Sequence, residues 1–267
     1  MKLSIITPSY NQGKFIRDTF DSILNQNINF ELEYILVDAV SKDETSKIVE
    51  EFSPKFKTRG IDFIYICEKD SGQSDAINKG FRLATGDIIT YLNSDDFYEP
   101  NSLQEVIEYF ENPPTGGPKI KWAYGGWNLV TKNSMIFRTL SPQKYSKNNL
   151  LNYCNIGQPS CFFRRELLNE VGMLDENLHL AMDYDLWLRF ASKYDAGIIG
   201  KIISNMRYYS EAKSSAKATA QLLETLRIGK KHTKLFSFRR FAQYFFYLRG
   251  LIAILLKVSK IQRNISH

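Results

Sequence analysis

Several common nucleotide-binding signatures are missing from this sequence of 267 residues. No Gly-x-x-x-x-Gly-Lys-[Ser/Thr] segment occurs anywhere, which argues against a P-loop NTPase. No Gly-x-Gly-x-x-Gly follows the first predicted strand, which argues against a dinucleotide-binding fold. Long apolar runs are missing too. The segment Met1–Pro8 lacks the apolar core of a signal peptide, and arginines interrupt the apolar segment Phe236–Val258, so we expect no membrane span.

Cysteine is scarce, with three residues in the whole chain. Cys67, Cys154 and Cys161 are scattered and have no metal-ligand spacing. This usage favours reduced thiols in a cytoplasmic protein. Because Cys67 ends an apolar run, we expect it to be a small buried hydrophobic residue.

Acidic residues are absent from the last part of the chain. From Leu226 to His267 there are ten Lys or Arg residues and no Asp or Glu, which leaves 25 basic and 29 acidic residues before that point. Ser214–Lys231 is predicted to be helical, and Phe236–Val258 is aromatic-rich and basic. Such an amphipathic tail favours an anionic membrane surface, and a helix that packs on the body or on a second subunit is the alternative. We find no nucleic-acid motif and expect no nucleic-acid partner.

Apolar patterning in the first hundred residues alternates between strands and helices. The predicted strands are Lys2–Pro8, Glu33–Asp38, Ile61–Cys67 and Ile88–Leu92, and helices are predicted near residues 14–25, 45–52 and 73–84. This βαβαβαβ order is typical of a parallel, doubly wound sheet. Beyond Pro100 the pattern becomes mixed. The predicted elements there are helices around residues 103–110, 165–171 and 183–193, a hairpin at 122–131 and 134–138, and strands at 161–163 and 196–203.

Acidic residues gather where the predicted strands end. Asp38, Asp70, Asp75 and the pair Asp95-Asp96 fall at or just past the ends of the second, third and fourth strands. In a parallel sheet these ends share the edge that binds ligands. Because hard cations such as Mg²⁺ and Mn²⁺ take carboxylate and phosphate oxygens, the set suggests a nucleotide held through a metal. For the Asp-Asp pair alone, a solvated polar loop is the simpler alternative.

Six short blocks resemble the family 2 glycosyltransferases in order and spacing, over about residues 1–215. The blocks are Thr7–Asn11, Val37–Asp43, Glu68–Gly80, Gly86–Ile88, Leu92–Asp96 and Met182–Arg189. The resemblance implies the GT-A fold, a Rossmann-like mixed, mostly parallel α/β sheet flanked by helices. It also implies an inverting transfer of a sugar from a nucleotide diphosphate to an acceptor hydroxyl.

The resemblance implies roles for individual residues. The implied donor-binding residues are Thr7, Pro8, Tyr10, Asp38, Asp70, Asn78, Lys79, Asn93 and Asp95. Tyr10 would stack on the base, Asp38 would accept a hydrogen bond from it, and Lys79 would bring positive charge near phosphate. An exposed helical lysine is the alternative for Lys79. Asp95 and Asp96 would hold the divalent metal, Mn²⁺ or Mg²⁺, that bridges the diphosphate.

Asp183 occupies the position of the family's general base, at the start of a predicted helix. Asp185 lies roughly 200° around that helix, so both carboxylates cannot face one site, and we assign the base to Asp183. The alternative is an acid that the helix dipole stabilises. Gln158 either borders the acceptor or lies in a plain loop.

Three departures from the family's pattern concern the site. Ala39 and Val40 stand where the family usually has glycines, which predicts a stiffer loop. Asn93 replaces an Asp found in many members, and Arg207-Tyr208-Tyr209 replaces an Arg-x-His segment. The missing His puts a third protein ligand for the metal in doubt.

The predicted organisation is a GT-A domain at 1–212, with a nucleotide-binding half at 1–100 and an acceptor half at 101–212, followed by a helical, basic extension at 213–267. We expect a UDP-sugar as donor and a lipid-linked or surface glycan as acceptor. We also expect a cytoplasmic enzyme that is peripheral to the inner face of the membrane, and a homodimer is one possible assembly. A sugar-nucleotide nucleotidyltransferase is one alternative, although Ser9–Gly13 lacks the basic residue its loop would need. A non-catalytic nucleotide-sugar-binding module is the other, although it would not need Asp183.

Overall fold

A computed structural model of the protein describes residues 1–113, 120–209, 217–232 and residue 248. The first hundred residues show the predicted alternation of strands and helices. The elements are β1 (Lys2–Ser9), α1 (Ile16–Leu24), β2 (Glu31–Asp38), α2 (Thr45–Thr58), β3 (Asp62–Cys67), α3 (Gln73–Leu83) and β4 (Ile88–Tyr91). The ends of six of these elements lie within two residues of the predicted ones, whereas α2 continues six residues past the predicted end at residue 52.

The second half contains both strands and helices, as predicted. The elements are β5 (Phe97–Tyr98), α4 (Ser102–Glu111), β6 (Trp122–Val130), β7 (Ile136–Leu140), α5 (Lys147–Asn152), the 3₁₀ helix η1 (Gln158–Ser160), β8 (Cys161–Arg164), α6 (Glu166–Val171), α7 (Met182–Lys193), β9 (Gly197–Arg207) and α9 (Ala218–Lys231). The strand β5, the helix α5 and the turn η1 were not predicted. The two-residue strand β5 forms because it pairs with β9, and the local sequence pattern does not predict this long-range contact.

The basic tail is described only as far as α9 and at residue 248. The aromatic segment Phe236–Val258 therefore lies outside the described residues apart from Leu248, and its contact with a membrane or a second subunit stays a prediction. Among the residues described, we find no helix with the length and hydropathy needed to span a bilayer.

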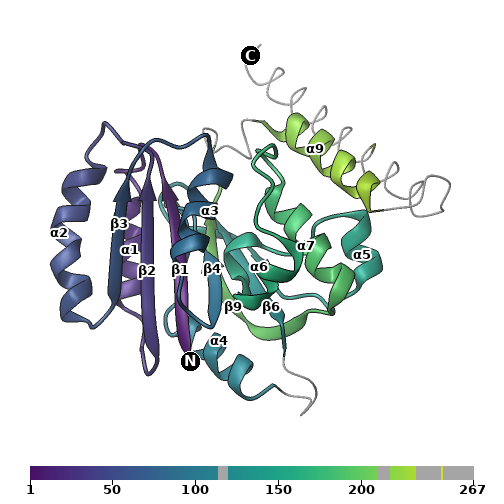
Figure 1. Ribbon diagram of the computed structural model, residues 1–267, viewed down its shortest axis with the longest axis horizontal. Coiled ribbons are helices and arrows are strands. Elements are labelled where there is room, and N and C mark those ends of the chain that lie inside the picture. The colour runs from purple at the N-terminus through teal and green to yellow at the C-terminus, as the bar shows by residue number, and fades with distance from the viewer. Residues whose placement is uncertain (114–119, 210–216, 233–247, 249–267) are drawn as a thin grey trace.

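All strands join one mixed sheet in the order β3-β2-β1-β4-β8-β6-β9-β5, with β7 paired to β6. The first four in this order run parallel. The strand β8 is antiparallel to both β4 and β6, whereas β9 is parallel to β6. Figure 1 shows the parallel half with α2 and α3, and the mixed half with α7 and α9 beside it.

Two apolar cores form because side chains alternate between the two faces of each strand. Leu3 and Ile5 of β1 pack on the face covered by α1, α2 and α4. Ile6 faces the other side, with α3, α5, α6, α7 and residue Ile228 of α9. The nearly continuous apolar run of β1 thus reflects burial on both faces, as in other parallel sheets.

Cys67 corrects one expectation, since it is exposed rather than buried. The strand β3 is the outermost strand of the sheet, and its residues are exposed or half-buried. The Cys67 thiol lies 3.7 Å from Oδ2 of Asp38.

The carboxyl ends of the parallel strands are level with one another. Ser9 of β1 lies opposite Asp38 of β2, which lies opposite Cys67 of β3. The Leu92 amide, just past β4, donates to the Ile6 carbonyl at 2.8 Å. The four loops that follow these strands therefore leave from one edge, and this edge places the candidate site.

Candidate active site

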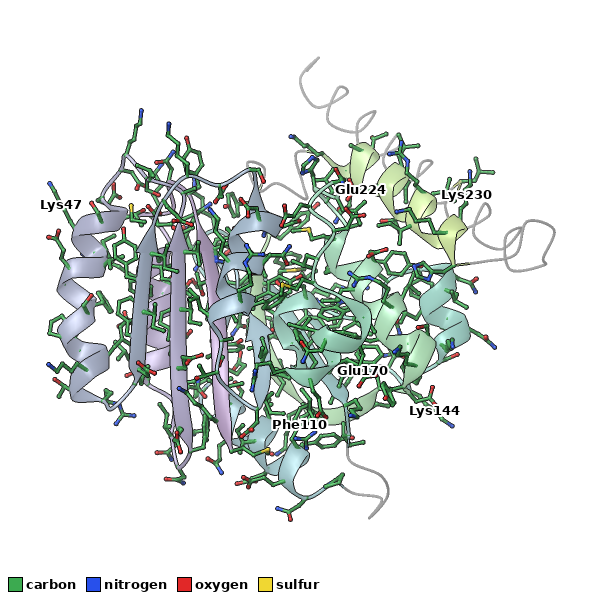
Figure 2. All side chains as sticks on the ribbon, viewed as in Figure 1. Lys47, Phe110, Lys144, Glu170, Glu224 and Lys230 are labelled. Atoms are coloured by element: carbon green, nitrogen blue, oxygen red, sulfur yellow. The ribbon has the colours of Figure 1, made fainter. Side chains whose placement is uncertain are left out.

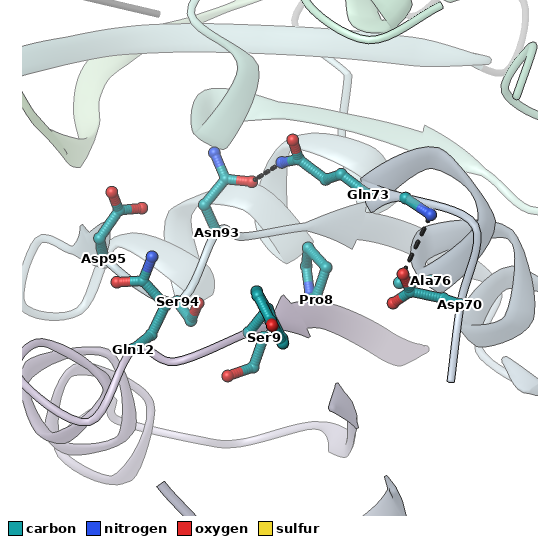
Figure 3. A pocket seen from close by; sticks show the side chains of 11 residues that line it. Pro8, Ser9, Gln12, Asp70, Gln73, Ala76, Asn93, Ser94 and Asp95 are labelled. Atoms are coloured by element: carbon teal, nitrogen blue, oxygen red, sulfur yellow. Dashed lines mark hydrogen bonds between the residues drawn. The ribbon is translucent and has the colours of Figure 1, made fainter. Parts of the chain in front are cut away.

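A cavity of about 300 Å³ opens at the carboxyl edge of the sheet. Its lining residues are Pro8, Ser9, Tyr10, Gln12, Asp70, Gly72, Gln73, Ala76, Asn93, Ser94 and Asp95. In Figure 3, Asp70 and Asp95 lie on opposite sides, with Asn93 and Gln73 between them. Of the nine predicted donor-binding residues, the structure brings five to this cavity, namely Pro8, Tyr10, Asp70, Asn93 and Asp95.

The two carboxylates of this cavity hold protons more tightly than usual. Burial raises the pKa of Asp70, although a hydrogen bond from the Gly72 amide at 3.0 Å opposes the change. Burial also raises the pKa of Asp95, against the effect of the Tyr209 hydroxyl, which donates to Oδ2 of Asp95 at 2.9 Å. Such desolvated carboxylates favour a ligand that supplies positive charge or hydrogen-bond donors.

Asp38 does not line the cavity and is 1% exposed. Its carboxylate accepts the Ser41 amide at 2.8 Å and also the Ser41 hydroxyl. The Ser41 hydroxyl oxygen in turn accepts the Asn11 amide at 2.7 Å. Asp38 thus fixes the loop that carries Tyr10, whose side chain is 60% exposed at the cavity. Thr7 is fully buried and does not line the cavity either.

Asn78 and Lys79 do not line the cavity either, and their expected contact with the donor stays a prediction. Asn78 is buried, and its amide bridges the Leu174 carbonyl and amide, each at 3.0 Å. It joins α3 to the segment after α6. The Lys79 ammonium donates to the Lys69 carbonyl at 2.7 Å and pairs with Glu68 at 3.0 Å, so it braces the loop that precedes α3.

Asp95 and Asp96 are adjacent in the sequence, but their side chains lie in different environments. Asp96 is 2% exposed and does not line the cavity. Its Oδ1 accepts the Arg207 amide at 2.8 Å, and its Oδ2 accepts the Asn93 side chain at 3.2 Å. Desolvation, together with the charge of Asp95, raises the pKa of Asp96 well above the usual range. In this arrangement Asp96 supports Asn93 and β9, and its expected role as a metal ligand stays a prediction.

Arg207 is buried, and the sequence had assigned no role to its side chain. Its guanidinium donates to Asp18 at 2.6 Å and to the Asp95 carbonyl at 2.9 Å, and lies 4.8 Å from the centre of the Phe15 ring. Tyr209, two residues further on, packs against the same ring in a tilted arrangement, with the ring centroids 5.0 Å apart. The end of β9 is thus attached to the Asp95 loop through backbone and side-chain contacts.

A second cavity, of about 130 Å³, adjoins the first. Its lining residues are Gln73, Tyr91, Asn93, Gln158, His179, Leu180, Met182, Asp183, Met206 and Gln221. Asp183 is half-buried near the start of α7, and its Oδ1 accepts the Tyr184 amide at 2.8 Å. Asp185 does not line this cavity; it is 6% exposed and pairs with Arg189 at 2.9 Å.

The two cavities share a wall made by Gln73 and Asn93. The Gln73 amide donates to the Asn93 oxygen at 2.7 Å. The Asn93 amide lies 3.3 Å from the side-chain oxygen of Gln158, whose own amide donates to the Tyr91 carbonyl. The side-chain amides of Gln73 and Asn93 therefore stand between the cavity that contains Asp70 and Asp95 and the cavity that contains Asp183.

Residues 4–172 match the family described as Glycosyl transferase family 2. The chain belongs to this family.

Relatives of this glycosyltransferase differ in how much of their length it spans. It is 32% identical over 219 residues to "UDP-Glc:alpha-D-GlcNAc-diphosphoundecaprenol beta-1,3-glucosyltransferase WfgD" of Escherichia coli, which covers 80% of each protein. It is 30% identical over 200 residues to "Uncharacterized glycosyltransferase RP339" of Rickettsia prowazekii. That match covers 70% of this chain and 58% of the relative, so the chain spans little more than half of the Rickettsia protein.

The fold is that of the GT-A glycosyltransferases. The mannosyltransferase PcManGT of Pyrobaculum calidifontis, solved in complex with GDP-Man and Mn²⁺, superposes with a TM-score of 0.66 at 17% identity. The superposition covers 97% of this chain and 75% of the other. It agrees with the fold that the sequence blocks predicted.

In this glycosyltransferase, several lining residues were not predicted from the sequence. Gln73 lies at the first position of α3, inside the block Glu68–Gly80. Its place in that block could have indicated that it lines the site. Gln221 lies outside every block, on α9, and nothing in the local sequence marks it as a neighbour of Asp183.

Proposed function

We propose that this glycosyltransferase transfers a sugar from a nucleotide diphosphate sugar, with UDP as the nucleotide, to a hydroxyl of a lipid-linked or surface glycan, with inversion. The observation that carries the proposal is the pair of adjoining cavities. One contains Asp70 and Asp95, the other contains Asp183, and Gln73 and Asn93 separate them. The Escherichia coli relative, which is named as a transferase that uses UDP-Glc and a diphosphoundecaprenol-linked sugar, supports this choice of donor and acceptor.

The donor would occupy the larger cavity. Tyr10 is exposed at the cavity and offers a ring on which a base stacks, and Asp70 offers a hydrogen-bond acceptor. The sugar would then reach the partition at Gln73 and Asn93, where side-chain amides supply both donors and acceptors for hydroxyl groups.

Asp183 would act as the general base. As the acceptor oxygen forms its bond to the anomeric carbon, the bond from that carbon to the diphosphate oxygen breaks, and the hydroxyl proton passes to Asp183. Attack from the acceptor cavity, on the side opposite the leaving group, inverts the anomeric configuration. General-base catalysis of this kind contributes about 10²–10⁴-fold in rate.

The family implies a divalent cation, Mn²⁺ or Mg²⁺, and the donor set fits one only in part. No cluster of three or more His, Cys, Asp or Glu residues suited to a metal occurs in the described part of the chain. Asp95 lines the cavity, whereas both oxygens of Asp96 are engaged elsewhere. One carboxylate still suffices for Mg²⁺-type coordination, because substrate phosphates and water complete the shell. When bound, the cation would stabilise the charge that develops on the leaving diphosphate.

A panel of nucleotide sugars with candidate acceptors tests the proposal. The wild type should transfer sugar from one donor, and Asp183→Asn should lower kcat by about 10²-fold or more while UDP binding measured by calorimetry stays unchanged. Asp195→Asn, at an exposed residue two positions past the end of α7, is the matched control and should be silent. Survival of transfer in Asp183→Asn would refute the base, and formation of sugar nucleotides instead would make the protein a nucleotidyltransferase.

A further inference from the structure

The helix α9 holds the segment that leads into α7. Its residue Glu224 accepts three backbone N–H groups, those of His179 at 3.1 Å, Leu180 at 2.8 Å and Ala181 at 2.8 Å. Figure 2 shows Glu224 on the side of α9 that faces the body of the protein. These three residues stand immediately before Met182, the first residue of α7.

This contact holds the cap residue of α7, Ala181, and the two residues before it. The first N–H groups of a helix have no partner within the helix, and a side chain of the residue before it usually satisfies them. That residue is Ala181, which has no side chain able to do so. A carboxylate also interacts favourably with the positive end of the helix dipole. Asp183 and Asp185 already place two carboxylates in the first turn of α7, and Glu224 adds a third from α9 that fixes the backbone just before that turn.

The segment held in this way is one side of the acceptor cavity. His179, Leu180, Met182 and Asp183 all line that cavity. Gln221, one turn before Glu224 on α9, lines it as well, and its amide donates to the Leu180 carbonyl at 3.1 Å. The helix α9 thus both fixes one wall and contributes a polar side chain to it.

Other contacts of α9 lie farther along the helix. Ile228 is fully buried in the core with α7, and the His232 imidazole lies 3.7 Å from Asp185. They attach the helix to the body without reaching the 179–181 segment. Attachment of α9 and positioning of Asp183 therefore depend on different residues, and substitutions can separate them.

We propose that Glu224 is the positioning residue for Asp183, and that α9 completes the acceptor site, where Gln221 contacts a hydroxyl of the acceptor sugar. The proposal rests on the proposed function, in which Asp183 is the base. Around this cavity, Gln158, His179 and Gln221 offer amide and imidazole groups that donate and accept hydrogen bonds, the chemistry that recognises a hydroxyl-rich ligand. The predicted domain boundary at residue 212 would then pass through the site rather than beside it.

Full-length variants with Glu224→Gln and Glu224→Ala test the proposal. We expect kcat to fall about 10–100-fold in Glu224→Ala, with a smaller fall in Glu224→Gln, because a misplaced base loses most of its effect. The KM for acceptor should rise, whereas the Kd for UDP should stay within about twofold, since the donor cavity does not contact α9. Hydrogen exchange at the amides of residues 179–181 should become faster in both variants, independently of any activity.

Val49→Ala is the matched control for stability. Val49 is buried in α2, in the opposite core, so its truncation lowers Tm without touching α9 or α7. Its kcat should stay at the wild-type value below the unfolding range. If Val49→Ala loses activity as much as Glu224→Ala at an equal loss of Tm, Glu224 has only a structural role and the proposal is wrong. Should Glu224→Ala fail to fold, Glu224→Gln and the amide exchange decide the question alone.

A double variant separates this proposal from the proposed function. If Glu224 acts through Asp183, adding Glu224→Ala to Asp183→Asn should lower kcat no further than Asp183→Asn alone. Additive losses would overturn the positioning role and leave the base assignment intact. An active Asp183→Asn enzyme would instead refute the base. Unchanged kcat and acceptor KM in Glu224→Ala would overturn the positioning role alone.

Discussion

The Tyr209 hydroxyl donates a hydrogen bond to Oδ2 of Asp95 at 2.9 Å. Tyr209 occupies the position at which the sequence departs from the family's Arg-x-His pattern, and Asp95 is the one member of the Asp-Asp pair that lines the donor cavity. A phenol at this position donates to the carboxylate and competes with any cation for the same oxygen, whereas an imidazole would be an additional ligand.

Replacing Tyr209 by Phe should therefore strengthen cation binding. Loss of one competing hydrogen bond, about 1 kcal/mol, corresponds to roughly a fivefold lower Kd for Mn²⁺ in the presence of UDP. Tyr209→His should lower it further by adding a nitrogen ligand. Electron paramagnetic resonance of free Mn²⁺ measures both values, with Tyr208→Phe as the neighbouring control. Weaker Mn²⁺ binding in Tyr209→Phe would show that the phenol assists the cation instead.

Asp95 and Asp96 should respond differently to substitution. Asp95→Asn should remove the Mn²⁺-dependent part of UDP binding, because its carboxylate is the one that reaches the cavity. Asp96→Asn keeps an oxygen acceptor for the Arg207 amide and should weaken Mn²⁺ only about tenfold, as expected for an outer partner. Asp96→Ala should in addition lower the free energy of unfolding by about 1–3 kcal/mol, since a buried N–H loses its partner.

Calorimetry of UDP with and without Mn²⁺, together with urea unfolding, separates these effects. Loss of the Mn²⁺ dependence in Asp96→Asn, with Asp95→Asn unaffected, would reverse the two roles. Neutralising both residues without any change in turnover or in cation dependence would refute a metal site at this loop.

The sequence predicted the parallel half of the fold because that half follows local rules. Each strand there is a short apolar run, each helix repeats at helical spacing, and the carboxyl ends of parallel strands must share an edge. That reasoning brought Asp70 and Asp95 to one cavity. It could not tell which oxygens would remain available. Asp38 and Asp96 also lie at strand ends, but their carboxylate oxygens already accept hydrogen bonds, from Ser41 and from the Arg207 amide respectively.

The contribution of α9 was outside the reach of sequence reasoning. Glu224 reads as an ordinary acid on an amphipathic helix, and its three partners are backbone amides 43 to 45 residues earlier in the chain. These partners are backbone amides, which do not depend on the residue type, so no sequence motif predicts the contact. The choice of Asp183 rested on its position in the family's block, and the helical repeat indicated that Asp185 could not face the same site. The structure shows Asp183 at the cavity and Asp185 paired with Arg189, and the role of base stays a proposal.

Val40→Gly should stabilise the protein. Val40 has a φ angle of 60°, in the left-handed region that β-branched residues avoid, and its side chain is 39% exposed. Relief of this strain, about 1–2 kcal/mol, exceeds the extra backbone entropy that glycine loses on folding, about 0.5–1 kcal/mol. Urea unfolding should therefore show a gain of up to about 1 kcal/mol. Val40→Ala, which keeps a β-carbon, is the control and should gain less; a loss of stability in Val40→Gly would contradict the argument.

Glu33 should make folding stability depend on pH in the acid range. Glu33 is 1% exposed, and its carboxylate accepts hydrogen bonds from the Ser4 and Thr85 hydroxyls and pairs with Lys2 at 3.0 Å. Burial alone would raise its pKa, but these donors outweigh burial and leave the pKa below the usual value of 4.5. The stabilisation by the ionised form is therefore complete above that value and is lost as pH falls through the lowered pKa of the folded state.

Glu33→Gln should consequently lower the free energy of unfolding by about 2 kcal/mol near neutral pH, the size expected for hydrogen bonds to a charged group. The difference from wild type should shrink as pH falls below 4.5, because the wild-type carboxylate then takes up a proton and loses the same advantage. Thermal unfolding between about pH 3 and 7 measures it, with Glu31→Gln, an exposed acid on the same strand, as the control. A difference that stays constant across this range would mean that Glu33 acts through its shape and not through its charge.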